Sequence, residues 1–249
     1  MNPLILVTND DGVYSEGIAT LFRAMSEIGD AYIVAPDRER SAVSHALTMH
    51  RPLRVEMISE KTYTVNGTPT DCVALAINKI LPRKPDVVAS GINKGANLGD
   101  DVTYSGTVSA AIEGTILNVP SFAISLAGNH PFLFETAVPY AKKVAQYIIQ
   151  YSLPYDTLLN VNVPNMPPDS IKGAVLTRQG KRIYENSIKD VLSPWGDTYY
   201  WIGGGKPYYE HGEGMDIQAV MDGYVSITPL HLDFTNYEAL EFLRKTWLL

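Results

Sequence analysis

Residues 4–12 read LILVTNDDG, a short apolar run followed directly by an asparagine, two aspartates and a glycine. A continuous apolar run of this length predicts a central β-strand buried on both faces, as in a parallel sheet covered by helices. The apolar residues after it recur at helical spacing and predict an amphipathic helix packed on the same sheet. These residues are Ile18, Leu21, Phe22, Met25 and Ile28. The stretch therefore predicts a strand, a turn and a helix, with NDDG at the carboxyl end of the strand.

The alternation of short apolar runs with amphipathic segments continues to about residue 165. Alternation of this kind is typical of a mainly parallel sheet with helices on both faces. Another helix should begin near Thr68, which can cap a first turn that contains Pro69. We expect the α/β class, with a doubly wound, mainly parallel sheet in a Rossmann-like three-layer arrangement. Further strands are expected at residues 31–35, 53–57, 62–65, 86–90, 120–125 and 158–163, and helices at 108–117 and 134–151.

The pattern changes beyond about residue 170. Residues 180–215 are rich in tyrosine and tryptophan, contain three glycines at 203–205 and show little alternation of strand and helix. Long aromatic excursions are usually functional or interfacial, so we interpret this one as an oligomerisation arm that packs against another subunit. An internal flap is the alternative. A strand at 224–228 and a capped helix at 236–249 should follow. We expect a single domain, residues 1–249, with a core of about 1–170 and a C-terminal arm and terminal helix of about 171–249.

The composition argues against several classes of protein. The chain has 249 residues, 20 Lys and Arg against 27 Asp and Glu, a formal net charge of −7 and one cysteine, Cys72. Nucleic-acid binders usually present basic faces, so polymeric nucleic acid is not an expected partner. A single cysteine forms no internal disulfide, and Cys72 is expected to be a small buried residue. The N-terminus has no signal-peptide pattern, and no stretch approaches the roughly 20 apolar residues that span a bilayer. We expect a cytoplasmic protein without a membrane partner.

Three loops with unusual polar residues should meet at the carboxyl edge of the sheet, where open α/β proteins bind ligands. The first carries Asp10 and Asp11, whose adjacent carboxylates repel unless a cation or hydrogen-bond donors compensate. Ser41 and Asn93, from the other two loops, can add neutral oxygens. Mg²⁺ and Mn²⁺ prefer oxygen ligands, so the loops predict a site for a divalent metal ion. A tight turn closed by Asx hydrogen bonds is the alternative interpretation of Asp-Asp-Gly.

The segment Ser105-Gly106-Thr107 precedes a helix of small residues. Its hydroxyls and the unpaired N–H groups of a helix start are suited to hold a phosphate, although the same residues can serve as a plain cap. A metal site beside a phosphate site indicates phosphoryl chemistry, in which the ion polarises oxygens and lowers the pKa of a water nucleophile. Hydrolysis is favoured over kinase activity because the chain has no GxxxxGK[ST] motif.

Other functions need patterns that this chain lacks. A receiver-like signalling domain, which binds Mg²⁺ without being an enzyme, is the main alternative because it also has an acidic pair after its first strand. It needs an aspartate at the end of its third strand, where this chain reads SGIN at 90–93, and it has about half this length. A haloacid-dehalogenase-type phosphatase needs Asp-x-Asp after the first strand, and a dinucleotide-binding enzyme needs GxGxxG there.

Five segments carry long motifs, in order along the chain. They are ILVTNDDG at 5–12, VAPDRERSAVSHALT at 34–48, GTPTDCV at 67–73, SGINKGANLGDDVTYSGTVSAAIEG at 90–114 and GYVSITPLHLDFT at 223–235. Together they resemble the SurE family of stationary-phase survival proteins, which are metal-dependent nucleoside monophosphate phosphatases.

The resemblance implies a role for each part of the site. One divalent ion per subunit, Mg²⁺ or Mn²⁺ with Co²⁺ as a further candidate, would be ligated by Asp10, Asp11, Ser41 and Asn93, with the two aspartates as the catalytic pair. Asn97 and the turn Ser105-Gly106-Thr107 would hold the phosphate. The implied activity is that of a 5′-nucleotidase acting on nucleoside 5′-monophosphates, with 3′-monophosphates and, in some members, short polyphosphate as further substrates. The C-terminal arm would be exchanged between subunits of a homodimer or homotetramer.

The chain departs from some relatives near its end. They have a histidine shortly after the counterpart of Asp233, where this chain has Asn236 and Tyr237. A catalytic or hinge role of that histidine is therefore not carried over, and Asp233 is a candidate only for stabilising the arm. His45 lies near Ser41 in the sequence, and we expect it to have a surface or core role rather than a catalytic one.

Overall fold

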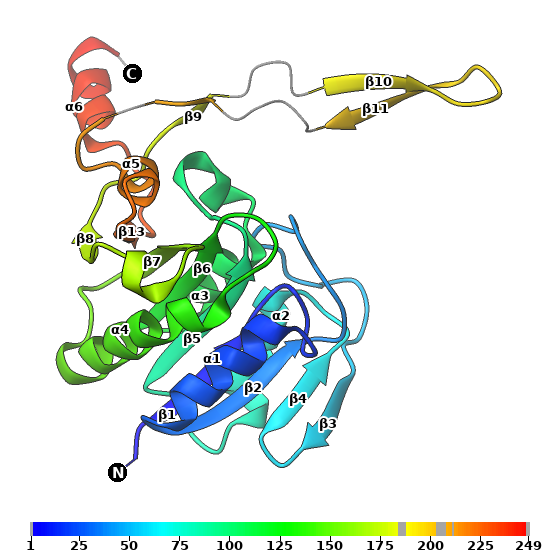
Figure 1. The fold of residues 1–249 in the computed structure, drawn as a ribbon, viewed down its shortest axis with the longest axis vertical. Helices are drawn as coiled ribbons and strands as arrows, with labels where there is room; N and C mark the ends of the chain where they lie inside the picture. Colours follow the sequence, from blue (N-terminus) through cyan, green and yellow to red (C-terminus); the bar gives the residue numbers. More distant parts are fainter. Residues whose placement is uncertain (1, 184–187, 203–207, 211, 248–249) are drawn as a thin grey trace.

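A nine-stranded sheet is the centre of the computed structural model, which describes residues 2–183, 188–202, 208–210 and 212–247 (Figure 1). The strands from β4 to β7 run parallel, β3 is antiparallel to β4, and β13 is antiparallel to β7. This arrangement confirms the predicted α/β class and the mainly parallel sheet. The order across the sheet is β3 (Val55–Ser59), β4 (Thr62–Val65), β2 (Asp30–Pro36), β1 (Leu4–Thr8), β5 (Val87–Lys94), β6 (Ser121–Ala127), β7 (Thr157–Pro164), β13 (Val225–His231) and β8 (Ala174–Leu176).

Alternate residues of the central strands face opposite helix layers, as the two-residue period of a strand requires. On β1, Ile5 and Val7 belong to the core cluster that contains α1 (Glu16–Ser26) and α4 (Val138–Tyr151). Leu4 and Leu6 belong to the cluster that contains residues of α2 (Pro69–Leu75) and α3 (Gly106–Ile116). Figure 1 shows α1 and α4 side by side on one face of the sheet. Burial on both faces explains why β1 is an unbroken apolar run.

The helix starts follow the capping residues seen in the sequence. Thr68 Oγ1 accepts a hydrogen bond from the N–H of Asp71 at 3.1 Å, and the Asp71 carboxylate accepts from the N–H of Thr68 at 2.9 Å. The same carboxylate accepts from the N–H and the hydroxyl of Thr48. Asp71 therefore has a structural role, and Cys72 beside it is buried as predicted. Ser105 caps α3, which begins at Gly106 rather than at residue 108.

β5 differs from the sequence prediction, which ends this strand at Ser90 because polar residues and glycines follow. The strand instead continues to Lys94, with an irregular register against β6 between Gly91 and Asn93. Gly91 has a φ of +138°, and a Cβ at this position would lie 2.3 Å from the carbonyl oxygen of Ile124, so only glycine fits. Asn93 consequently reaches the carboxyl edge as part of a strand and not of a loop.

Beyond β8 the chain leaves the sheet and forms an arm that extends away from it (Figure 1). The sequence analysis found little alternation of strand and helix here and assigned no strands. The arm contains two antiparallel strand pairs, β9 (Arg182–Ile183) with β12 (Tyr208–Tyr209) and β10 (Ile188–Leu192) with β11 (Thr198–Ile202). Apolar side chains on the ribbon β10–β11 are exposed, including Leu192 and Trp201. The glycines at 203–205, which the sequence analysis assigned to the arm, lie outside the described residues.

The chain returns to the sheet through α5 (Asp216–Met221) and β13 and ends in α6 (Tyr237–Thr246). The buried carboxylate of Asp216 accepts hydrogen bonds from the N–H groups of Gly99 and Gly180, at 2.9 and 2.8 Å. It thereby ties the base of the arm to the segment that follows β5. Hydrogen bonds from Thr235 and Tyr237 lower the pKa of Asp233 to about 2, so Asp233 joins the turn before α6 to the first residue of that helix.

None of the helices in the described ranges is long and apolar enough to cross a membrane.

Candidate active site

An open cavity of about 430 Å³ lies at the carboxyl ends of β1 and β5, beside the start of α3. The four expected metal ligands all line it, together with Asn97 and Ser105. Gly106 and Thr107 are not part of the lining. The cavity therefore brings together side chains from the loop after β1, the loop of Ser41 and the end of β5, at the edge of the α/β sheet where ligands are expected. Its lining consists of Asp10, Asp11, Glu39, Ser41, Ala42, Asn93, Lys94, Ala96, Asn97, Asp101, Tyr104 and Ser105.

Asp10 is a buried carboxylate, only 6% exposed. Its Oδ1 accepts a hydrogen bond from the hydroxyl of Thr107, which is itself fully buried. Burial raises the pKa of Asp10 to about 6; the hydrogen bond from Thr107 opposes the rise, and the charge of Asp11 adds to it. The charge of this carboxylate is poorly solvated, so a cation placed beside it would be bound favourably.

Asp11 is less buried than Asp10. The ammonium of Lys94 is 3.5 Å from its Oδ1, and the N–H of Lys94 donates to its Oδ2 at 3.4 Å. Burial raises the pKa of Asp11, and the charge of Lys94 opposes the rise. The sequence analysis did not identify Lys94 as a site residue. A lysine directly after the expected ligand Asn93, at a strand end, is the signal that could have indicated it.

The loop that carries Ser41 is joined by backbone hydrogen bonds to the loop after β1 and to the segment before α3. The N–H of Arg40 donates to the carbonyl of Asp10 at 2.7 Å, and the N–H of Ser44 donates to the carbonyl of Tyr104 at 3.3 Å. The Ser41 hydroxyl donates to Glu39 at 2.6 Å. These contacts place the Ser41 oxygen at the same cavity as the two aspartates.

The start of α3 approaches Asp10 so closely that position 106 must be a glycine. A Cβ there would lie 2.7 Å from the Cβ of Asp10 and 2.9 Å from its Oδ2. Ser105 Oγ accepts the capping hydrogen bond from the N–H of Val108 at 3.1 Å, so its own hydrogen can be donated into the cavity. Ser105 and Asn97 thus offer donors to an anion, whereas Thr107 acts through Asp10.

The donor set fits a divalent metal ion. Among the described residues there is no group of three His, Cys, Asp or Glu side chains that could hold a metal, so any site must also use neutral oxygens. The amide nitrogen of Asn93 donates to the carbonyl of Gly95 at 3.0 Å, so its oxygen is the atom that could ligate a metal ion. Two aspartates face one lysine, and a hard cation with oxygen ligands would balance the remaining charge.

His45 does not line this cavity. Its Nε2 lies 2.8 Å from Oε2 of Glu113, a buried residue of α3. His45 therefore connects the loop of Ser41 to α3.

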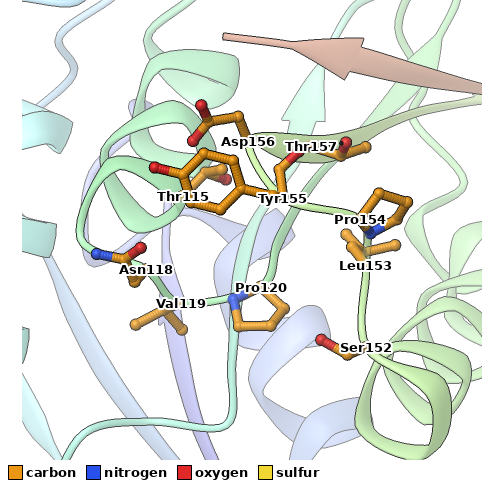
Figure 2. Close-up of a pocket in the computed structure, with 10 residues that line it drawn as sticks. All are labelled: Thr115, Asn118, Val119, Pro120, Ser152, Leu153, Pro154, Tyr155, Asp156 and Thr157. Atoms are coloured by element: carbon orange, nitrogen blue, oxygen red, sulfur yellow. Dashed lines mark hydrogen bonds between the residues drawn. The ribbon is translucent and has the colours of Figure 1, made fainter.

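A smaller cavity, of about 150 Å³, lies at the opposite, amino edge of the sheet (Figure 2). It is formed where α3 gives way to β6 and where the turn at Ser152 enters β7. Asn118, Val119 and Pro120 lie on one side of it, and Ser152, Leu153 and Pro154 lie on the other. None of the expected site residues lines it.

Comparison with known proteins agrees with the motifs. The family model described as "Survival protein SurE" matches residues 5–186. The chain belongs to the SurE family. The protein named 5′-nucleotidase SurE from Geobacter sulfurreducens is 52% identical over 241 residues, covering 96% of this chain and 92% of that protein. Its counterpart from Geobacter metallireducens is 53% identical over 244 residues, covering 98% and 96%.

The fold agrees with this membership. The crystal structure of the SurE protein from Aquifex aeolicus superposes with a TM-score of 0.87 and 44% sequence identity, covering 98% of this chain and 99% of that one. The nine-stranded sheet is therefore a SurE-type sheet.

Proposed function

We propose that this SurE-family chain is a metal-dependent 5′-nucleotidase (EC 3.1.3.5) that hydrolyses nucleoside 5′-monophosphates to nucleoside and phosphate. Nucleoside 3′-monophosphates and short polyphosphate belong to the proposed substrate range. The observation that carries the proposal is the buried, incompletely balanced pair Asp10 and Asp11 beside the capped start of α3. Relatives that carry the name 5′-nucleotidase SurE, at about half identity over nearly the whole chain, support it.

In this proposal one divalent ion per subunit, Mg²⁺, Mn²⁺ or Co²⁺, is held by Asp10, Asp11, Ser41 and Asn93. When bound, such an ion polarises phosphoryl oxygens and lowers the pKa of a water molecule. The buried Asp10 contributes a charge that bulk water does not screen, and the hydroxyl of Thr107 keeps its carboxylate oriented. Lys94 balances part of the charge of Asp11.

The phosphate of the substrate lies against the start of α3 in this proposal. Asn97 and Ser105 donate hydrogen bonds to its oxygens from the cavity wall, and the backbone at Gly106 and Thr107 adds the positive end of the helix. Donors that are fixed before the reaction begins stabilise the charge that develops on phosphorus oxygens in the transition state. The nucleoside extends from the open side of the cavity.

The C-terminal segment has a separate role in the proposal. The core of about 1–170 carries the site, and residues of about 171–249 join subunits into a homodimer or homotetramer. Exposed apolar side chains on β10–β11 support this role, because isolated soluble subunits rarely expose such a surface. Neither polymeric nucleic acid nor a membrane is a proposed partner, and cytoplasmic location stays a prediction.

Phosphate release from AMP tests the proposed activity. We expect release that requires added Mn²⁺ or Mg²⁺ and stops with a chelator, and kinetics across a panel of 5′- and 3′-nucleotides would define the preference. Slow autophosphorylation from a small phosphodonor, without phosphate release from AMP, would instead support the receiver-like alternative. The end of β5 carries Asn93 where that alternative needs an aspartate.

A further inference from the structure

Asn97 is held by side chains that the sequence analysis treated as ordinary strand residues. Asn162 forms two hydrogen bonds with the main chain of residue 97: its Oδ1 accepts from the Asn97 N–H at 2.8 Å, and its Nδ2 donates to the Asn97 carbonyl at 2.9 Å. Asn160 Nδ2 donates to the same carbonyl at 2.8 Å. The N–H of Asn97 can only donate and its carbonyl can only accept, so these two partners determine which way the Asn162 amide points.

The side chain of Asn97 is held as well. Its Nδ2 donates to the hydroxyl of Ser125 on β6 at 2.7 Å. One hydrogen of the Asn97 amide is thereby used, and the second is the donor that the side chain offers to the cavity that it lines. The backbone and the side chain of Asn97 are thus both oriented by β6 and β7.

These residues share one face of the sheet. Ser125 and Asn162 are register partners, and Asn160 lies two residues before Asn162 on β7. The alternate residues Leu159, Val161 and Val163 face the core with α1 and α4. On the α3 face, β7 begins with the apolar Leu158 and changes to the two asparagines as it nears the carboxyl edge. The change occurs where residue 97 crosses the strand.

Burying these two amides and the hydroxyl costs free energy, because each polar group loses its hydrogen bonds to water. Asn160, Asn162 and Ser125 are fully buried, and Asn160 Oδ1 is among the buried side-chain atoms of the described chain that have no hydrogen-bond partner. Apolar side chains would fill the same space without amides to desolvate. Apolar residues, however, could not form the hydrogen bonds that the two asparagines make to the N–H and carbonyl of Asn97.

We propose that Ser125, Asn160 and Asn162 are positioning residues for substrate phosphate, acting through Asn97. They fix the direction of the Asn97 amide before substrate binds, so that its second N–H meets a phosphate oxygen without reorganisation. The inference rests on the proposed function, because it takes Asn97 as a phosphate ligand. It adds three residues from strands that do not line the cavity.

The first experiment compares Ser125→Ala with Ser121→Ala. Both replacements remove a fully buried hydroxyl from the same face of β6, but Ser121 donates to Val119 at the amino end of the strand, away from the cavity. Ser125→Ala should weaken binding of inorganic phosphate and lower kcat/KM for AMP by about tenfold, while Mn²⁺ affinity stays unchanged. Ser121→Ala should change neither. Calorimetric titration with phosphate in the presence of Mn²⁺ gives the binding readout.

A double-mutant cycle separates positioning from general packing. If Ser125 acts through the Asn97 amide, the double variant Asn97→Ala/Ser125→Ala should bind phosphate no more weakly than Asn97→Ala alone. A purely structural role would make the two losses multiply. Unchanged phosphate affinity in Ser125→Ala, or losses that multiply in the double variant, would overturn the proposal.

Asn162→Asp extends the test to the backbone. It keeps an acceptor for the Asn97 N–H and turns a second oxygen toward the Asn97 carbonyl, so we expect a loss of about 100-fold in kcat/KM. Ser226→Ala, at the register partner of Asn162 on β13, is the control and should not alter phosphate affinity. Melting curves identify a variant that does not fold, and the Ser125 cycle then decides.

The outcomes also distinguish this inference from the proposed function. A wild-type protein that binds phosphate with the pattern above but does not hydrolyse nucleotides contradicts the activity and supports the positioning role. A wild-type protein that binds no phosphate contradicts both.

Discussion

Aspartates lie near both ends of β1, but their charges are balanced differently at the two ends. At the amino end, Asp86 accepts from the N–H of Leu4 at 2.7 Å and pairs with Arg83 at 2.8 Å, and Asp30 on the neighbouring β2 pairs with Lys61 at 2.6 Å. Each carboxylate there has its own cation, close to solvent. At the carboxyl end, Lys94 is 3.5 Å from Asp11, whereas the partner of Asp10 is the uncharged hydroxyl of Thr107.

The pKa shifts follow this difference. The hydrogen bond from Arg83 lowers the pKa of Asp86, whereas burial raises the pKa of Asp10 to about 6. Ion pairs within the chain therefore balance the charges of the aspartates at the amino end. The carboxyl end keeps negative charge that the described residues do not balance, and such a place is where an added cation gains the most. The balance of charge around an aspartate, more than the residue type, distinguishes a functional aspartate from a structural one.

The largest effect should separate Asp10→Asn from Asp86→Asn. Asp10→Asn removes a charge from the cavity and should lower kcat for AMP by about 10³-fold, because the preorganised charge at the site is lost. Asp86→Asn alters the other end of β1 and should leave kcat unchanged. Phosphate release in the presence of Mn²⁺ measures both, and near-wild-type turnover of Asp10→Asn would reject the ligand assignment.

Gly106→Ala tests whether the approach of α3 to Asp10 matters. The added Cβ would lie 2.7 Å from the Cβ of Asp10, so the helix start or Asp10 must move. We expect kcat/KM to fall by about 100-fold and stability by about 1–3 kcal/mol. Ile116→Ala, at the exposed far end of α3, should keep full activity. Kinetics and urea unfolding give the two values, and normal kinetics for Gly106→Ala would contradict the close-approach argument.

Stabilisation of the protein by a metal ion should depend on the aspartates at the carboxyl edge of the sheet and not on those at the amino edge. Mn²⁺ at about 100 times its dissociation constant should raise the free energy of unfolding of the wild type by about 2.7 kcal/mol. Asp11→Asn should lose most of this gain, and Asp30→Asn at the amino edge should keep it. Thermal unfolding with and without Mn²⁺ is the measurement; equal gains in both variants would show that the ion binds elsewhere.

The smallest effect concerns the pH dependence of stability at the amino end. A carboxyl whose pKa is lowered by folding stabilises the protein above its unfolded pKa of about 3.9, and the gain disappears as pH falls through the lower folded value. Asp86→Asn should therefore be less stable than the wild type at pH 6, by about 0.5 kcal/mol because Asp86 and Arg83 are both about two-fifths exposed. Urea unfolding at pH 6 and at pH 3 checks this, and a difference that does not shrink at pH 3 would contradict it.

Much of the core could be predicted because its signals are local. The apolar run of β1, the helical spacing in α1 and the cap of α2 each depend on neighbouring residues, and all three occur as expected. The predicted end of β5 was wrong, because the polarity of residues 90–94 was taken to exclude a strand. The space beside Ile124, which admits a glycine at position 91, cannot be seen in the local sequence.

Local sequence patterns were enough to predict most strands and helices of the core and the acidic pair after the first strand, because hydrophobic periodicity and capping act over a few residues. The three-dimensional fold was needed to find that Lys94 faces Asp11, that α3 touches Asp10 at Gly106, and that Asn160 and Asn162 support Asn97. These contacts, like the hydrogen bond between Thr107 and Asp10, which are 97 residues apart, join distant segments of the chain. They depend on strand order and register, which short-range patterns in the chain do not specify.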